Sequence, residues 1–245
     1  MTIDHVVKQL QHRLDDLPEE LEHRRIFLST YLRTTVAVGN GIEEARFEDP
    51  EWVEVWDVAF AELYLQAHDA DVAGPPARAS RPWRLAFDAP PELPPLRHVL
   101  LGINAHVNYD LPQALLAVID DAEFADPALL DRRRRDHERI DTILAGRVGA
   151  EDEELTVAGG KNLLDRVLTP LNRLSSRRFL REARRKVWHN TAELQRARQA
   201  GTASYELRLA ELELLSAAKI ADLLEPGQVL LRLAVSGFGV LLPPP

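Results

Sequence analysis

Histidine, asparagine and aspartate side chains recur at helical spacing in one otherwise apolar segment, RHVLLGINAHVNYDLP, over residues 97–112. Residues four apart lie on the same face of a helix, so His106 and Asp110 would form a His–carboxylate pair there. Imidazole and carboxylate groups bind divalent cations and act in general acid–base catalysis. Because the neighbouring side chains are apolar, we expect the pair to be buried and therefore to need partners. The segment predicts either a metal site or a buried hydrogen-bond network.

Pro112 is expected to disturb the helix beside this pair. A proline inside a helix lacks the N–H and clashes with the carbonyl four residues earlier, so the helix should be kinked or restarted near Asn108. A freed carbonyl, together with His106, Asn108 and Asp110, would place several oxygen and nitrogen ligands at one point. Asp57, which lies among aromatic and apolar residues, would need a partner and could complete a metal shell. Further residues expected to line the site are His98, Asn104, Asn108, Tyr109, Asp136, Tyr64 and Tyr31.

The spacing of the pair is not unusual by itself, because the chain holds four histidines with a carboxylate four residues later. These are His12/Asp16, His106/Asp110, His137/Asp141 and His189/Glu193. The first and last lie among charged neighbours and are expected to be surface pairs. Only the pair in the apolar segment points to buried chemistry.

Composition excludes several classes of site. The 245 residues carry a formal net charge of -9 and no cysteine, which removes disulfides, thiolate metal sites and cysteine nucleophiles. Net acidity makes nucleic acid an improbable partner. A basic stretch over residues 173–186 predicts either a solvated helix face or an anion-binding stripe. The residues of that stripe would be Arg178, Arg181 and Arg185.

Apolar periodicity predicts helices over most of the chain, and no segment of strand length alternates cleanly between apolar and polar residues. We therefore expect an all-α fold, a single-domain multi-helix bundle over residues 1–245 with its core over 20–225. The central element would be an apolar helix over residues 96–121. A long proline-rich loop would span residues 70–95, and a non-helical tail would span 226–245. The charged first residues and the lack of a long apolar run favour a cytoplasmic location without a membrane span.

The apolar segment also resembles the core motif of a bacterial domain-of-unknown-function family, found mainly in high-GC bacteria, with the pattern Gly-x-Asn-Ala-His-x-Asn-x-Asp-Leu-Pro. Here the motif is carried by Gly102, Asn104, Ala105, His106, Asn108, Asp110, Leu111 and Pro112. Weaker similarity extends over most of residues 25–190. In such relatives the position of His137 is usually aromatic and that of Asp141 is often asparagine, which makes this second pair a poor ligand candidate. The resemblance supports the choice of site and implies no particular reaction.

Two functions follow from the motif, and whether the protein is an enzyme stays open. The first is a metal-dependent hydrolase, in which His106 and Asp110 hold a divalent cation that activates water, and Asp57 or Asp136 completes the shell. The second is a non-catalytic helical protein that binds a small molecule or a partner, with the motif acting as a structural polar network. The two differ in whether the purified protein holds a stoichiometric metal.

Overall fold

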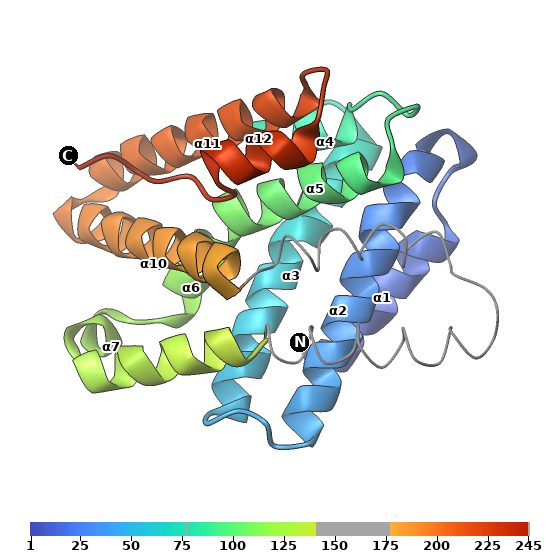
Figure 1. The fold of residues 1–245 in the computed structure, drawn as a ribbon. Helices are drawn as coiled ribbons and strands as arrows, with labels where there is room; N and C mark the ends of the chain where they lie inside the picture. The colour runs from blue at the N-terminus through green and yellow to red at the C-terminus, as the bar shows by residue number, and fades with distance from the viewer. Residues whose placement is uncertain (77, 141–176, 245) are drawn as a thin grey trace. The chain divides into compact units, whose positions relative to one another are not determined.

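The computed structural model describes residues 1–76, 78–140 and 177–244, and all regular elements within these ranges are helices (Figure 1). The predicted all-α fold is confirmed. The described chain forms two compact units, and the boundaries fall inside α3 (Pro50–Ala73) and at the end of α6 (Leu111–Val118). The single domain over residues 1–245 stays a prediction. None of the described helices is long and apolar enough to cross a membrane.

The first unit contains the N-terminal residues 1–58 and a later segment, described over residues 118–140. Its elements are α1 (Ile3–Asp15), η1 (Glu19–Arg24), α2 (Arg25–Glu43), the first part of α3, α7 (Asp121–Ala125) and a helix over residues 127–140. α1 lies against α2, as Figure 1 shows, and buries Ile3, Val6 and Leu10 at helical spacing. Asp120 caps α7 with a capping box to Glu123, which satisfies N–H groups that a helix start would otherwise leave without acceptors.

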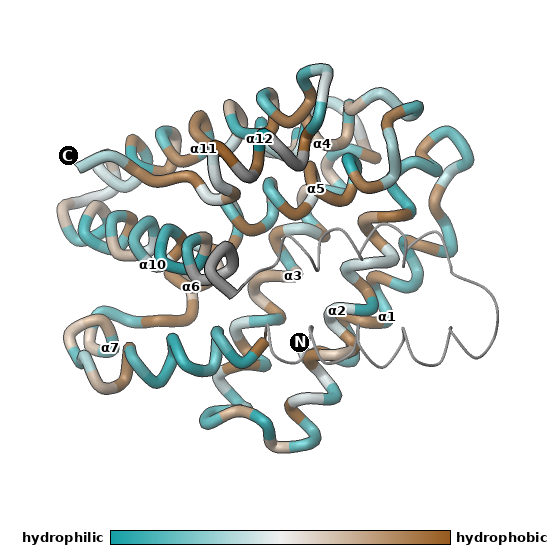
Figure 2. The backbone as a smooth tube through the Cα atoms, in the orientation of Figure 1, coloured by the Kyte–Doolittle hydropathy of each residue, from teal (hydrophilic) through white to brown (hydrophobic). Residues whose placement is uncertain are grey.

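The second unit contains the motif segment. Its elements are the rest of α3, α4 (Arg81–Phe87), α5 (Pro95–Ala105), η2 (His106–Asp110), most of α6, α10 (Arg177–Ala200), α11 (Thr202–Leu224) and α12 (Val229–Ser236). α11 packs against α10, α4 and α5. Figure 2 shows the coloured part of α10 as largely hydrophilic, while α5 carries many hydrophobic residues. α5 is therefore the apolar helix at the centre of this unit's packing, as its sequence predicts.

Three predicted boundaries need correction. The central helix runs over Pro95–Val118 rather than 96–121, and a π-helical turn divides it. The proline-rich loop over 70–95 is wrong in part, because α3 extends to Ala73 and α4 occupies Arg81–Phe87. Pro82 lies in the first turn of α4, where its missing N–H costs no helical hydrogen bond. The tail over 226–245 is helical at Val229–Ser236 and non-helical over residues 237–244.

An ion-pair cluster around Arg133 ties the segments of the first unit together. The guanidinium lies 2.6 Å from Asp49 Oδ2 and 2.6 Å from Glu123 Oε1, and its carbon lies 4.7 Å from the centroid of the Trp52 ring. Burial opposes ionisation of Asp49, but hydrogen bonds from Arg133 and the Trp52 N–H, with the positive charge of Arg133, lower its pKa. Arg133 thus joins the helix over residues 127–140 to the starts of α3 and α7.

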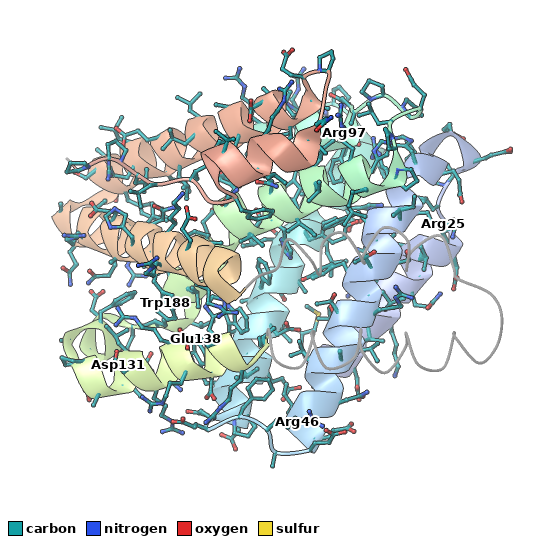
Figure 3. All side chains as sticks on the ribbon, in the orientation of Figure 1. Arg25, Arg46, Arg97, Asp131, Glu138 and Trp188 are labelled. Atoms are coloured by element: carbon teal, nitrogen blue, oxygen red, sulfur yellow. The ribbon has the colours of Figure 1, made fainter. Side chains whose placement is uncertain are left out.

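Replacing this arginine should destabilise the first unit. Arg133→Met leaves the partly buried Glu123 without its cation and leaves Asp49 with Arg132 alone, so we expect the free energy of unfolding to fall by about 3 kcal/mol in urea denaturation. Arg134→Met is the matched control, since Arg134 pairs at an exposed site with Asp131, which is labelled in Figure 3, and should cost less than about 1 kcal/mol. Equal losses in the two variants would contradict the role of Arg133.

Candidate functional site

A π-helical turn over His106–Asp110 lies at the centre of the motif. α5 ends at Ala105, and the N–H of Leu111 donates to the carbonyl of His106, five residues earlier, in place of the α-helical spacing of four. Pro112 has no N–H to donate to residue 108, so the regular pattern would lose a hydrogen bond here in any case. The expectation that the helix is disturbed beside Pro112 is confirmed, and the disturbance is a π-turn.

Asp110 is a shared acceptor for two ring N–H groups. Its Oδ2 lies 2.9 Å from Nδ1 of His106 and 2.7 Å from Nε1 of Trp83 on α4. All three side chains are buried, with relative exposures of 2% for Asp110, 4% for His106 and 1% for Trp83. Hydrogen bonds to a carboxylate in such a low-dielectric environment are strong and fix the orientation of both rings.

Aromatic rings enclose the imidazole of His106. The ring of Phe60 stacks on it with centroids 3.6 Å apart and an interplanar angle of 6°. Tyr64 and Trp83 contact it at centroid distances of 6.0 and 5.8 Å. Burial lowers the pKa of His106 and raises that of Asp110, although the hydrogen bond between them opposes both shifts. The neutral imidazole, with its proton on Nδ1 facing Asp110, is therefore the favoured form.

The two asparagines of the motif form a second line of hydrogen bonds. Nδ2 of Asn104 donates to the carbonyl of Leu100 at 2.8 Å, and Nδ2 of Asn108 donates to Oδ1 of Asn104 at 3.0 Å. Asn108 also donates to the carbonyl of Phe238 at 3.2 Å and accepts the N–H of Val240 at 3.2 Å. Both N–H groups and the oxygen of this buried amide are thus engaged with the protein.

Other residues predicted to line the site fall into two groups. Tyr64 contacts His106, His98 is buried on α5, and Tyr109 lies partly buried within the π-turn, where burial raises its pKa. Three further residues, Tyr31, Asp57 and Asp136, belong to the first unit. Asp136 is completely buried there and accepts the N–H groups of residues 48 and 49 and the guanidinium of Arg139. It stabilises the start of α3.

The structure places two of the three predicted metal ligands together. His106 and Asp110 are in direct contact, whereas Asp57 lies in the other unit. Within residues 1–76, 78–140 and 177–244, no group of three histidine, aspartate or glutamate side chains is arranged to hold a metal ion. Nδ1 of His106 forms the hydrogen bond to Asp110. This nitrogen therefore does not point toward a position where both side chains could bind one metal ion. In this arrangement His106 and Asp110 are hydrogen-bond partners of each other.

Sequence reasoning missed the roles of two aromatic residues. Trp83 lies in the stretch that was expected to be a proline-rich loop, yet it supplies a donor to Asp110. Phe60 stacks on His106 from α3, although it was not among the residues expected to line the site. The usable signal was the isolated tryptophan, because a buried indole N–H needs an acceptor.

The predictions for the other His–carboxylate pairs and for the arginine stripe are confirmed in part. The surface pair His12/Asp16 is confirmed, with ring nitrogen and carboxylate 2.7 Å apart and both side chains exposed. A surface location is wrong for Glu193, whose side chain is 7% exposed and accepts from Arg208. Asp141 lies outside the described residues, and so do the side chains of Arg178 and Arg181; Arg185 is exposed on α10. The anion-binding stripe therefore stays a prediction.

Asp57 is the buried carboxyl to which no described residue donates a hydrogen bond. It is 5% exposed, and burial alone raises its pKa to about 7. Because the folded state keeps this proton at a pH where the unfolded chain has lost it, the free energy of unfolding falls as pH rises from about 4 to about 7. The shift corresponds to a loss on the order of 4 kcal/mol across that interval.

Asp57→Asn should remove this pH dependence. We expect the variant to match the wild type near pH 4 and to be more stable than it above pH 7, in urea denaturation followed across the interval. Asp131→Asn, at an exposed ion pair, should retain the wild-type profile. If the free energy of unfolding of the wild type did not change between pH 4 and 7, the raised pKa of Asp57 would be refuted.

Trp83→Phe tests the shared acceptor. The variant keeps an aromatic ring but removes the N–H that donates to Asp110, so we expect the free energy of unfolding to fall by about 2 kcal/mol. Trp52→Phe is the control, because no described residue accepts a hydrogen bond from the indole N–H of Trp52. Its loss should be clearly smaller, and equal melting temperatures for the two variants would contradict the assignment.

Among comparisons with known proteins, a family model matches the chain. No curated protein and no solved structure matches the chain. A family model described as "Family of unknown function (DUF5995)" matches residues 3–226, which include the π-turn, Trp83 and the helices around them. The chain belongs to this family of unknown function.

Proposed function

We propose that this protein is a non-catalytic helical binding protein, in which the motif holds a peptide segment and does not form an active site. The observation that carries the proposal is the engagement of Asn108. Its amide, at the centre of the motif, donates to the carbonyl of Phe238 and accepts the N–H of Val240. The motif's polar groups thereby recognise the backbone of a distant segment, which is the chemistry of a binding protein.

The environment of His106 supports the same proposal. A metal-dependent hydrolase needs a coordination position open to water and substrate. His106 is 4% exposed, is covered by Phe60 at a ring distance of 3.6 Å and directs Nδ1 at Asp110. Burial that lowers the pKa of His106 and raises that of Asp110 disfavours the imidazolium–carboxylate form. These features suit a network that fixes the π-turn.

His106→Ala distinguishes this proposal from a metal-dependent hydrolase. The variant removes the donor to Asp110 and the ring stacked on Phe60, so we expect the melting temperature to fall by about 5 °C or more. The fall should be the same with and without a chelator, and elemental analysis of the purified wild type should find no stoichiometric divalent metal. Calorimetry and elemental analysis on the full chain provide both measurements.

His12→Ala provides a matched control, because His12 makes a contact with Asp16 at the same spacing on an exposed face. Its melting temperature should stay within about 1 °C of the wild type. A stoichiometric metal that is lost in His106→Ala and retained in His12→Ala would overturn the proposal and establish the metal site.

A further inference from the structure

An extended segment that follows α12, residues 237–244, is defined here as the strap. It begins at Gly237, whose φ of +74° turns the chain out of the helix in a conformation that favours glycine. In Figure 1 the strap runs from α12 between α10 and α11 to the end of the chain, and hydrogen bonds to both helices place it there. The strap is bound through its backbone.

Two asparagines bind the strap backbone in the same way. Asn108 donates to the carbonyl of Phe238 and accepts the N–H of Val240, at 3.2 Å each. Asn190 on α10 donates to the carbonyl of Val240 at 3.1 Å and accepts the N–H of Leu242 at 2.9 Å. The second pattern repeats the first after two residues, the repeat of an extended chain. Each amide therefore offers a donor and an acceptor as a neighbouring β-strand would.

Cationic side chains bind other carbonyls of the strap. Lys186 Nζ donates to the carbonyl of Gly239 at 3.0 Å, and Arg208 Nη2 donates to that of Pro243 at 2.7 Å. His189 Nε2 lies 3.1 Å from the carbonyl of Leu242. Arg208 is itself held by Glu193 at 3.2 Å. We call Asn108, Lys186, His189, Asn190 and Arg208 together the strap site.

The side chains of the strap set a pattern for what can bind. Phe238 is 6% exposed and Leu242 is completely buried, while Leu241 between them is 50% exposed. A Cβ at Gly239 would lie 2.9 Å from Cδ and 3.3 Å from Cβ of Lys186, so a side chain there would force Lys186 to move. The pattern is an apolar residue, glycine, two residues and a second buried apolar residue, followed by proline.

We propose that the strap site is a peptide-binding site, that the strap is its intramolecular ligand, and that an extended apolar peptide of a partner protein with this pattern takes its place. The inference rests on the proposed binding function. Hydrogen bonds to backbone groups accept any extended peptide, and the buried positions supply specificity. The family match ends at residue 226, before α12, whereas every residue of the strap site lies within it. The residues of the strap site thus lie inside the matched range, and the strap lies outside it.

A partner protein is favoured over a second copy of this chain. The strap of a second copy would make the same contacts as the chain's own strap and would gain no binding energy over it. The chain's own strap also competes at the high effective concentration that a covalent connection gives. A different peptide can fill the same backbone sites with better side-chain contacts, and therefore displace the strap.

The experiment uses the full chain and a fluorescent peptide of residues 236–244. Leu242→Asp weakens the strap at a buried position, and Leu241→Asp is the matched control at its exposed neighbour. By fluorescence anisotropy we expect the peptide to bind Leu242→Asp at least about tenfold more tightly than the wild type or Leu241→Asp. Adding Asn190→Ala to Leu242→Asp should weaken peptide binding by about tenfold, since two backbone hydrogen bonds are lost. A peptide with Gly239→Val should also bind more weakly.

Amide hydrogen exchange of the wild type provides a measurement that needs no variant. The N–H groups of Val240 and Leu242 should exchange faster than those of Leu212 and Ile220 in the buried face of α11, since the strap opens without unfolding the helices. Equal exchange of all four, or no peptide binding to a folded Leu242→Asp variant, would overturn the inference. So would a dimer of that variant that binds no peptide, because a second copy would then be the occupant. These outcomes leave the metal analysis and the His106→Ala melting unaffected, so failure here is distinct from failure of the proposed function.

Discussion

A buried polar group must have a hydrogen-bond partner, and this requirement organises the second unit. The segment over Pro95–Val118 is buried among apolar side chains. It nevertheless carries four polar residues that are each at most 4% exposed, namely Asn104, His106, Asn108 and Asp110. Leaving one such group without a partner costs more than an ordinary hydrogen bond contributes. The partners come from outside the helix, from α4 for Asp110 and from the strap for Asn108. Segments with little apolar periodicity are thereby fixed to the central helix.

The two side-chain pairs of the motif face opposite sides of the helix, because they are offset by two residues. His106 pairs with Asp110 and Asn104 pairs with Asn108, each at a spacing of four. Two residues along a helix rotate a side chain by about 200°, so the two pairs face nearly opposite sides. One side meets the aromatic rings of α3 and α4, and the other meets the strap. One short motif therefore joins the aromatic core to the segment that follows α12.

Local chemistry made part of this arrangement predictable. Apolar periodicity predicted the helices, and the spacing of His106 and Asp110 predicted their contact. The missing N–H of Pro112 predicted that the helix would be disturbed beside it. The partners could not be predicted in the same way. Trp83 is 27 residues from Asp110, and Phe238 is 130 residues from Asn108, and no periodic pattern links positions so far apart. The strap lies in the tail that was expected to be non-helical, but its pairing depends on side-chain amides whose partners cannot be predicted from the residues next to them in the sequence.

Three buried carboxyl groups differ in how many hydrogen-bond donors they have, and therefore in what their burial does to the fold. Asp136 accepts two backbone N–H groups and a guanidinium, and Asp110 accepts two ring N–H groups. Such donors replace the water that burial removes, so these carboxyls can join segments of the chain. Asp57 is also buried, but within the described residues no donor offsets its loss of water, and its pKa rises to about 7. Burial raises the pKa of Asp110 as well, but its two donors tie α4 to the central helix, whereas Asp57 makes no such connection among the described residues.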